Sequence, residues 1–578
     1  MLSSNTTMSV QGSEIKIIGV YGISGCGKTT LINQLKGTLG EDQFIYFDGS
    51  TAIDRVVQGG LPAFKVMSGD EQKVWREKAI MQLTEDCRES GKNGVVAGHA
   101  ILWAQGEQLP NYIDTPADWE SYTHLIYLDI SADQVYKQRA GDAHRERDGA
   151  SAAHLELWAA EEVAYLRGIC LERGILVSVV RPGKTSVLQR VSGVLLDFTQ
   201  SDEATNTASV ERALDSIMQD VALDTVFVFD ADRTLAPQDT GKMFWARVSG
   251  PSDPLKTIFN SSLRYTHPAF RQAALLYADV AASDVRFDKV CDGVAADIML
   301  YPEILSFLHK LTKSKHAGAV VITSGLQAIW EKILIRAGLF ESVKVIGAGT
   351  FHVVTPDVKA NLVRRLQCMY GARVVAFGDS PLDLPMLCSA NHAVVIVGEA
   401  AHRSQTMDVQ LATAIDEEGL RAYQVLLPST TTQRLDEAKL PHIELSHMEA
   451  TLGGLVFLDA SQDHPHASAL LTSPTRDSSI HGPALREHHR QIGWFLSVPY
   501  LTEHIGLEEH AISHVQGRTI PGHRLLYENR TLVIPLMRGG EPMALGVNDA
   551  FPAASFLHAK APADVQRKHI QAFKTVVP

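Results

Sequence analysis

Short apolar runs that end in polar residues or glycine recur along the chain and alternate with stretches of helical periodicity. Continuous apolar runs of this length are typical of parallel strands that are buried on both faces of a sheet. Strands that alternate with helices predict α/β domains with mainly parallel sheets. The prediction rests on the runs Ile15–Tyr21, Phe44–Asp48, Asn93–His99, His124–Ile130, Val226–Leu235, Ala319–Gly325 and Val374–Asp383.

The length of the chain, 578 residues, exceeds what one hydrophobic core usually supports. Its composition turns polar at 199–207 and again at 427–434, and polar stretches of this kind are typical of domain junctions. We therefore predict three α/β domains, at 1–200, 222–424 and 435–578.

Two carboxylates and a hydroxyl close the strand that begins at Val226. Asp230, Asp232 and Thr234 follow the apolar run directly, at the carboxyl end where open α/β sheets bind their ligands. Alone, this Asp-x-Asp-x-Thr pattern could equally be a capping turn that opens a helix. The choice between a catalytic motif and a cap therefore depends on the rest of the chain.

Further polar residues follow the later strands in a fixed order. Ser324 and a glycine end one strand, Lys359 follows, and Asp379 and Asp383 close a third strand. In order and spacing, these four pieces together resemble the haloacid dehalogenase superfamily over about 223–424, and its phosphoserine-phosphatase-like branch in particular.

The resemblance implies a role for each of these side chains. Asp230 would attack phosphorus and form an aspartyl phosphate, while Asp232 would protonate the leaving alcohol and then activate water. The acid at the second position favours a phosphatase over an ATPase. Ser324 and Lys359 would hold the phosphoryl oxygens. Mg²⁺ would be bound by oxygen ligands from Asp230, the backbone carbonyl of Asp232 and Asp379, with Asp383 supporting the site.

The insert at about 237–300 separates the first two motifs, where this superfamily places a cap that selects the substrate. Its aromatic residues occur at roughly helical spacing, which predicts a small helical cap. Aromatic residues in such a pattern are more often core than ligand contacts. The sequence therefore does not name the substrate. The aromatic residues are Phe244, Trp245, Phe259, Tyr265, Phe270, Tyr277 and Phe287.

A glycine-rich loop follows the first predicted strand. The stretch 22–29 matches Gly-x-x-x-x-Gly-Lys-[Ser/Thr] between a strand and a helical pattern, and it resembles a phosphate-binding P-loop. Lys28 would contact the β- and γ-phosphates of ATP, and Thr29 would bind Mg²⁺. Cys26 is read as a small loop residue, with a reactive thiol as the alternative. The predicted phosphate-binding residues are Gly22, Gly25, Cys26, Gly27, Lys28, Thr29 and Thr30.

Beyond the loop, the pattern resembles small-molecule and nucleotide kinases. Asp48 ends the second strand, where related kinases often place a general base. Arg139 and Arg145 resemble lid arginines that close over phosphates, although a solvated helix face explains them equally well. Asp48 and Asp129 both compete for the second acid of the P-loop fold, and His99 is read as a packed residue.

The last part of the chain resembles a uracil phosphoribosyltransferase in the segments 470–490 and 532–543. Arg538 and Glu541 are its best candidates for ligand contacts. The phosphoribosyl pyrophosphate loop of that family is expected downstream, where the sequence reaches Pro578. We therefore expect a truncated phosphoribosyltransferase-like fold without transferase activity.

Net charge and cysteine content narrow the classes of function. A net charge of −13 without a long basic run argues against nonspecific nucleic-acid binding. Six scattered cysteines indicate a reducing compartment, and no apolar run reaches about 18 residues, the length of a membrane span. We expect a cytoplasmic protein without a membrane segment, and a homo-oligomer is left open.

Two hypotheses of function follow. The first is an Mg²⁺-dependent phosphohydrolase fused to an ATP-dependent kinase-like domain, acting on nucleotide-related or other small phosphorylated metabolites. The second is a regulatory protein that senses nucleotides through non-catalytic flanking domains. Asp232 favours the first hypothesis, because binding alone does not need a proton donor. The missing terminal loop and the uncertain second acid of the P-loop domain favour the second hypothesis for the two flanking domains.

Overall fold

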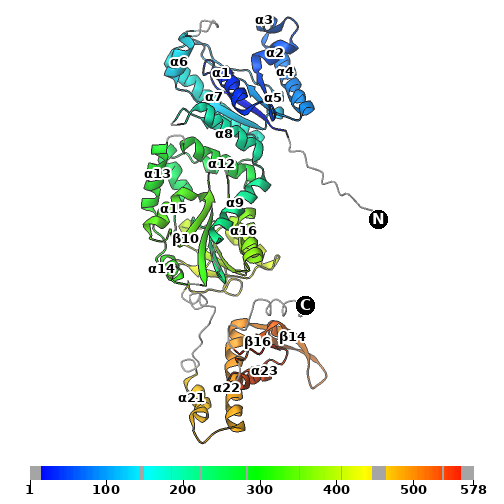
Figure 1. The fold of residues 1–578 in the computed structure, drawn as a ribbon, viewed down its shortest axis with the longest axis vertical. Coiled ribbons are helices and arrows are strands. Elements are labelled where there is room, and N and C mark those ends of the chain that lie inside the picture. Colours follow the sequence, from blue (N-terminus) through cyan, green and yellow to red (C-terminus); the bar gives the residue numbers. More distant parts are fainter. Residues whose placement is uncertain are drawn as a thin grey trace, which may run out of the picture. The chain divides into compact units, whose positions relative to one another are not determined.

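The computed structural model describes residues 15–141, 149–183, 185–219, 223–281, 284–314, 316–349, 352–404, 406–445, 464–536 and 539–560. The chain divides into two compact units, Met1–Leu455 and Val456–Pro578. Figure 1 shows the first unit in blue to yellow and the second in orange to red.

The first unit opens with a parallel five-stranded sheet in the order β2-β3-β1-β6-β7. Its strands are β1 (Ile17–Tyr21), β2 (Phe44–Asp48), β3 (Asn93–Ala97), β6 (His124–Leu128) and β7 (Leu176–Val180). The larger helices with this sheet are α1 (Lys28–Leu39), α4 (Gly69–Ser90), α7 (Ala152–Arg173) and α8 (Val187–Gln200). Shorter elements are α2 (Gly49–Val56), α3 (Gly60–Lys65), β4 (Ile101–Leu102), β5 (Asn111–Tyr112), α5 (Pro116–Ser121) and α6 (Ala132–Ala140).

A second parallel sheet follows in the same unit, in the order β10-β9-β8-β11-β12-β13. Its strands are β8 (Thr225–Phe229), β9 (Ala317–Leu326), β10 (Val343–Ala348), β11 (Arg373–Gly378), β12 (His392–Val397) and β13 (Ala422–Leu426). Its helices are α9 (Glu203–Met218), α14 (Pro302–Leu311), α15 (Gln327–Arg336), α16 (Pro356–Tyr370), α17 (Leu384–Ser389) and α18 (Met407–Asp416).

The central strand β8 shows why its sequence is apolar throughout. Successive side chains of a strand point to opposite faces, so Phe227 and Phe229 enter one core while Val226 and Val228 enter the other. The two large sheets confirm the prediction of an α/β protein with mainly parallel sheets.

Four helices occupy the stretch between β8 and α14, namely α10 (Thr240–Ser249), α11 (Pro254–Asn260), α12 (His267–Ala281) and α13 (Asp284–Asp297). Asp239 and Asp253 start α10 and α11, because each carboxylate accepts a hydrogen bond from a backbone N–H in the first turn of its helix. Phe244 and Tyr277 are buried against each other, so some of the aromatic residues in this stretch are core residues.

The second unit contains α21 (Pro465–Arg476), α22 (Pro483–Ile505) and α23 (Glu541–Ala550). Strands β14 (Leu507–Ser513) and β15 (Thr519–Leu525) form an antiparallel hairpin, and β16 (Leu532–Val533) pairs in parallel with β17 (Ser555–Phe556). A small core of Leu525, Phe551 and Ala554 lies among α22, β15, β16 and α23. In the described parts of both units, each helix is too short or too polar to cross a lipid bilayer.

Candidate active site

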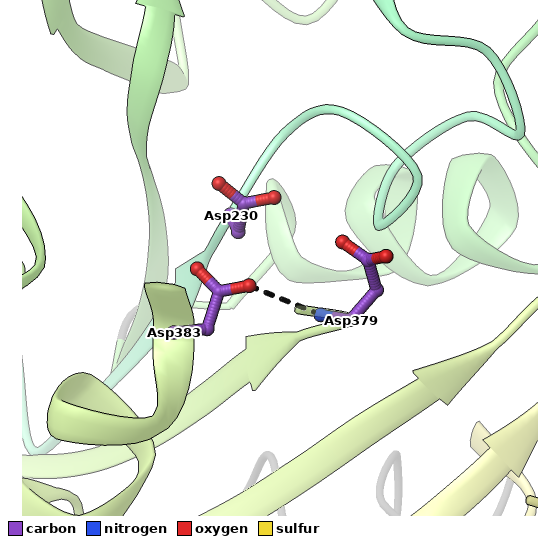
Figure 2. A group of neighbouring side chains, drawn as sticks. All are labelled: Asp230, Asp379 and Asp383. Atoms are coloured by element: carbon purple, nitrogen blue, oxygen red, sulfur yellow. Dashed lines mark hydrogen bonds between the residues drawn. The ribbon is translucent and has the colours of Figure 1, made fainter. Parts of the chain in front are cut away.

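The carboxylates that follow β8 and β11 meet at the carboxyl ends of these two central strands of the second sheet. The two strands are neighbours and parallel, so their carboxyl ends lie side by side. Carboxylate oxygens of Asp230, Asp379 and Asp383 all lie within 4.8 Å of one another, and the three side chains are buried. Figure 2 shows them around a common space, with the backbone N–H of Asp379 donating to Asp383 Oδ2 at 3.2 Å.

Lys359 on α16 lies against this cluster. Its Nζ donates to Asp230 Oδ1 at 2.5 Å and to Asp383 Oδ1 at 2.7 Å, and only 1% of the residue is exposed. Burial opposes the charged form of Lys359, but the two carboxylates raise its pKa above the ordinary value. Lys359 is therefore an ammonium ion that holds Asp230 and Asp383 in place.

The three carboxylates carry more negative charge than one lysine balances. Burial raises the pKa of Asp230 to about 6, with repulsion from Asp383 adding to the effect and Lys359 opposing it. Burial raises the pKa of Asp379 well above its usual range, and repulsion from Asp383 and Asp230 adds to the rise. A buried cluster of oxygen donors with excess negative charge fits Mg²⁺, which prefers carboxylate ligands.

Asp232 lies beside the cluster in a different environment. Its Oδ1 accepts a hydrogen bond from the backbone N–H of Thr240 at 2.6 Å, at the start of the cap helix α10. Burial raises the pKa of Asp232 to about 7, and Asp239 adds to the rise. A carboxyl group with this pKa is partly protonated near neutral pH, so it could act as a general acid.

The end of β9 lies close to Asp232. A Cβ atom on Gly325 would lie 2.7 Å from Asp232 Oδ2, so a larger residue would displace the carboxylate. Ser324 lines a cavity that Asp230, Asp232 and Gly325 also line. Its hydroxyl donates to the carbonyl oxygen of Val354 at 2.7 Å. Thr234, the last residue of the first motif, donates to Asp230 Oδ2 at 3.3 Å. The four sequence motifs thus meet in one place.

The cavity above these residues has a volume of about 1100 Å³. It is also lined by residues of α10, α11 and α12, including Lys242, Lys256 and Tyr277. The two lysines were not predicted as site residues, since isolated lysines in a helical insert carry no motif. Phe259, Tyr265 and Phe270 also line the cavity, so part of the aromatic set does face the site.

A second cavity, of about 830 Å³, lies at the carboxyl ends of the first sheet. It is lined by the last residues of four strands, Tyr21, Asp48, Ala97 and Leu128. The residues 24–30 of the glycine-rich loop also line it. Gly22, Gly25 and Gly27 have φ values of 148°, 97° and 94°, which larger side chains rarely adopt.

Lys28 lies inside this loop and is 8% exposed. Its Nζ donates to the carbonyl oxygen of Gly22 at 2.5 Å and lies 3.3 Å from His99 Nδ1. Thr29 donates from Oγ1 to Asp48 Oδ2 at 2.9 Å, so the predicted metal ligand and the predicted base are in contact. Cys26 is buried, with its Sγ 3.8 Å from Lys28 Nζ.

The two acids that compete as the second acid of the P-loop fold lie in different surroundings. Asp48 contacts Thr29, whereas Asp129 accepts a hydrogen bond from Arg181 at 2.7 Å. Arg139 donates to the carbonyl oxygen of Ser24 at 3.0 Å, next to the loop. The predicted contacts Arg145 and Arg538 lie outside the described residues, and Glu541 begins α23 in the second unit.

Sequence patterns missed three charged residues near the P-loop. Arg76 and Asp118 line the cavity, and burial raises the pKa of Asp118 to about 6. Glu162 is fully buried and accepts hydrogen bonds from the backbone N–H groups of Ala100 and Ile101. Each comes from a helix or turn with ordinary polar periodicity, so only the fold reveals its position.

Three family models match separate segments of the chain. Residues 21–156 match an AAA domain, 227–388 match a haloacid dehalogenase-like hydrolase, and 461–578 match a uracil phosphoribosyltransferase. These matches confirm the three predicted resemblances: a P-loop kinase-like segment, a haloacid dehalogenase segment and a phosphoribosyltransferase-like segment. No curated protein matches the chain.

Solved structures similar to parts of the chain include hydrolases and a kinase. A haloacid dehalogenase family hydrolase from Salmonella enterica serovar Typhi has 16% identity and a TM-score of 0.23, over 36% of this chain and 78% of its own. A substrate-bound phosphoserine phosphatase has 16% identity and a TM-score of 0.23, over 31% and 89%. A shikimate kinase from Acinetobacter baumannii, bound to shikimate, has 16% identity and a TM-score of 0.24, over 33% and 97%.

Proposed function

We propose that the chain is an Mg²⁺-dependent phosphohydrolase that works through an aspartyl phosphate, fused to an ATP-binding kinase-like domain. The observation that carries the proposal is the contact of Lys359 with both Asp230 and Asp383, next to Asp379. These four residues come from three separate motifs. A structural salt bridge would need only one carboxylate, whereas a phosphoryl-transfer site needs a nucleophile and cation ligands together.

The reaction proceeds in two steps on this chain's own residues. A carboxylate oxygen of Asp230 attacks phosphorus, the bond from phosphorus to the substrate oxygen breaks, and Asp232 donates its proton to the leaving alcohol. Asp232, now a carboxylate, takes a proton from water, whose oxygen attacks the phosphorus of the aspartyl phosphate. Inorganic phosphate leaves and Asp230 is regenerated.

The surrounding residues stabilise the charge of the reacting phosphoryl group. Asp230, the backbone carbonyl of Asp232, Asp379 and Asp383 would hold the metal site, and Ser324 and Lys359 would contact the phosphoryl oxygens. Mg²⁺ bound there would neutralise charge on the phosphoryl oxygens. Lys359 keeps Asp230 aligned toward phosphorus.

The P-loop cavity supports ATP binding by the kinase-like domain. Gly22, Gly25 and Gly27 let the loop backbone face phosphate oxygens, and Lys28 adds a positive charge. Asp48 would act as the base toward an acceptor hydroxyl, and Thr29 beside it would bind Mg²⁺.

The size and lining of the hydrolase cavity support a substrate larger than a simple phosphorylated amino acid. A cavity of about 1100 Å³ with basic residues and an aromatic wall suits a nucleotide-related or other small phosphorylated metabolite. The full chain should be screened against phosphorylated metabolites for release of inorganic phosphate, with and without Mg²⁺. Release that does not depend on Mg²⁺, or no release from any phosphomonoester, would contradict the proposal.

A further inference from the structure

Helix α12 of the cap is buried on every side over residues 269–277. Phe270, Ala273, Ala274 and Tyr277, spaced as one face of a helix, line the hydrolase cavity. Gln272, Leu275 and Asp279, spaced as another face, contact the first sheet. One helix therefore forms a wall of the hydrolase cavity and also packs against the kinase-like domain.

The contact completes the edge of the first sheet. Strand β7 is an edge strand, and edge strands leave backbone N–H and C=O groups that need partners. The side-chain amide of Gln272 accepts from the N–H of Val177 at 2.8 Å and donates to the carbonyl oxygen of Val177 at 2.9 Å. Asp279 accepts from the N–H of Val179 at 2.9 Å. Side chains of the cap helix α12 thus form hydrogen bonds with backbone groups of β7 that a neighbouring strand would otherwise form.

Charged and apolar contacts reinforce this pairing. Arg271 of α12 forms an ion pair with Asp197 of α8, and both side chains are buried. Arg167 of α7 contacts Asp279 at 2.9 Å, and Leu275 lies within the core of the first sheet. Removing one partner of a buried ion pair is strongly destabilising, because it leaves the other charge buried without a counter-ion. A change at either end of the pair is therefore felt at the other.

Helix α8 connects this contact to the P-loop cavity. Val187 and Leu188, at its first turn, line the P-loop cavity. Asp197 lies near its other end, about 14 Å along the axis at about 1.5 Å per residue. The ion pair between Asp197 and Arg271 therefore gives a shift of the first turn of α8 a route along the helix to the cap. Figure 1 shows α8 next to α12.

We propose that nucleotide bound at the P-loop restrains the cap through α8, β7 and α12. In this way the P-loop domain regulates the phosphohydrolase. This inference rests on the proposed function of the hydrolase site. A nucleoside triphosphate fills the cavity beside Val187 and Leu188 and orders α8, and α12 then resists the cap movement that admits substrate and releases product. The regulatory ligand is a nucleoside triphosphate, and the regulated step is turnover at Asp230.

The test uses the full chain with Mg²⁺, an aryl phosphate as substrate and a non-hydrolysable ATP analogue as the regulator. In the wild-type protein, the analogue should lower kcat by about fivefold, within the usual range of coupling between sites. Gln272→Leu keeps the volume of the side chain but removes both hydrogen bonds to Val177, so it should reduce the response to less than about twofold. Its hydrolysis without the analogue should stay within about twofold of wild type, because Gln272 does not line the hydrolase cavity.

Gln82→Leu is the matched control. Gln82 lies on the exposed surface of α4, so this variant should keep the full response to the analogue. Thermal unfolding of both variants shows whether Gln272→Leu remains folded. If it does not, a second measurement on the wild-type protein decides the question.

Hydrogen exchange of the wild-type amides provides that measurement and does not require hydrolysis. The analogue should slow exchange in 267–281 of α12 as well as in 22–30 of the loop. Slowed exchange in the loop with unchanged exchange in α12 would overturn the proposed coupling, even if no phosphate ester is hydrolysed. A lack of hydrolysis together with slowed exchange in α12 would support the coupling and contradict the proposed hydrolase function instead.

Discussion

The hydrolase site and the P-loop site both lie at the carboxyl ends of parallel strands, but they are built from different atoms. The hydrolase site joins the side chains of Asp230, Asp379, Asp383 and Lys359, which lie within hydrogen-bonding or metal-binding distance of one another. The P-loop site is mainly backbone, shaped by glycines with positive φ, and adds the Lys28 ammonium.

If both sites bind phosphate groups, as proposed, they do so in two different ways. Side-chain carboxylates recruit a metal ion and can also attack phosphorus, so a single changed atom removes the chemistry. Backbone N–H groups bind phosphate without reacting with it. A changed side chain therefore weakens binding but leaves these backbone N–H groups in place. Substitutions at the two sites should therefore differ in size and in kind.

The largest expected effect is at the nucleophile. Asp230→Asn should lower Mg²⁺-dependent hydrolysis of an aryl phosphate by at least about a thousandfold, because an amide is a poor nucleophile. The release of inorganic phosphate measures the change. Asp357→Asn, at an exposed acid on α16, is the matched control and should keep near wild-type activity. Near wild-type activity of Asp230→Asn would show that Asp230 is not the nucleophile and that the chemistry of the hydrolase site does not depend on this side chain.

At the P-loop, Lys28→Ala should weaken ATP binding by about tenfold to a hundredfold, the usual contribution of a hydrogen bond from a charged group. Isothermal titration calorimetry measures the affinity. Lys36→Ala, on the exposed side of α1 beside Glu41, is the control. If Lys28→Ala reduced aryl phosphate hydrolysis as much as ATP binding, the two cavities would not be separate sites.

Asp379→Asn should mainly affect metal binding. It removes one charge from the buried cluster, so the Mg²⁺ concentration for half-maximal hydrolysis should rise by about tenfold, and saturating Mg²⁺ should restore part of the activity. A titration with Mg²⁺ after treatment with a chelator measures the shift. An unchanged Mg²⁺ requirement would place the metal elsewhere.

The smallest effect is that of pH on the activity of the wild-type protein. Asp232 must be protonated to donate to the leaving alcohol, and its pKa is raised to about 7. The protonated fraction falls as pH rises through that value, so kcat/KM for an alkyl phosphate should decline on the alkaline side. Asp232→Asn should be much less active and should lack this decline. The same decline in Asp232→Asn would assign the titration to another group.

The sequence determined the strands and the motifs that end them. Apolar runs bounded by glycine and acids are local signals, so the parallel sheets, the P-loop and the order of Asp230, Ser324, Lys359 and Asp379 could be predicted without coordinates. The domain limits 1–200, 222–424 and 435–578 and the roles of the site residues remain predictions. Glu162, Asp118 and Arg76 carried no local signal and could not be predicted.

Only the tertiary structure decided which side chains meet. Lys359 lies 129 residues from Asp230 in sequence, and their contact depends on how α16 packs beside β8. The two roles of α12 are equally hidden, because the spacing of Arg271, Gln272 and Asp279 would mark a solvent-exposed face in an isolated helix. In the structure that face packs against β7 and α8 instead. Local patterns record the periodicity of one segment, whereas a site is formed by the long-range packing of several segments.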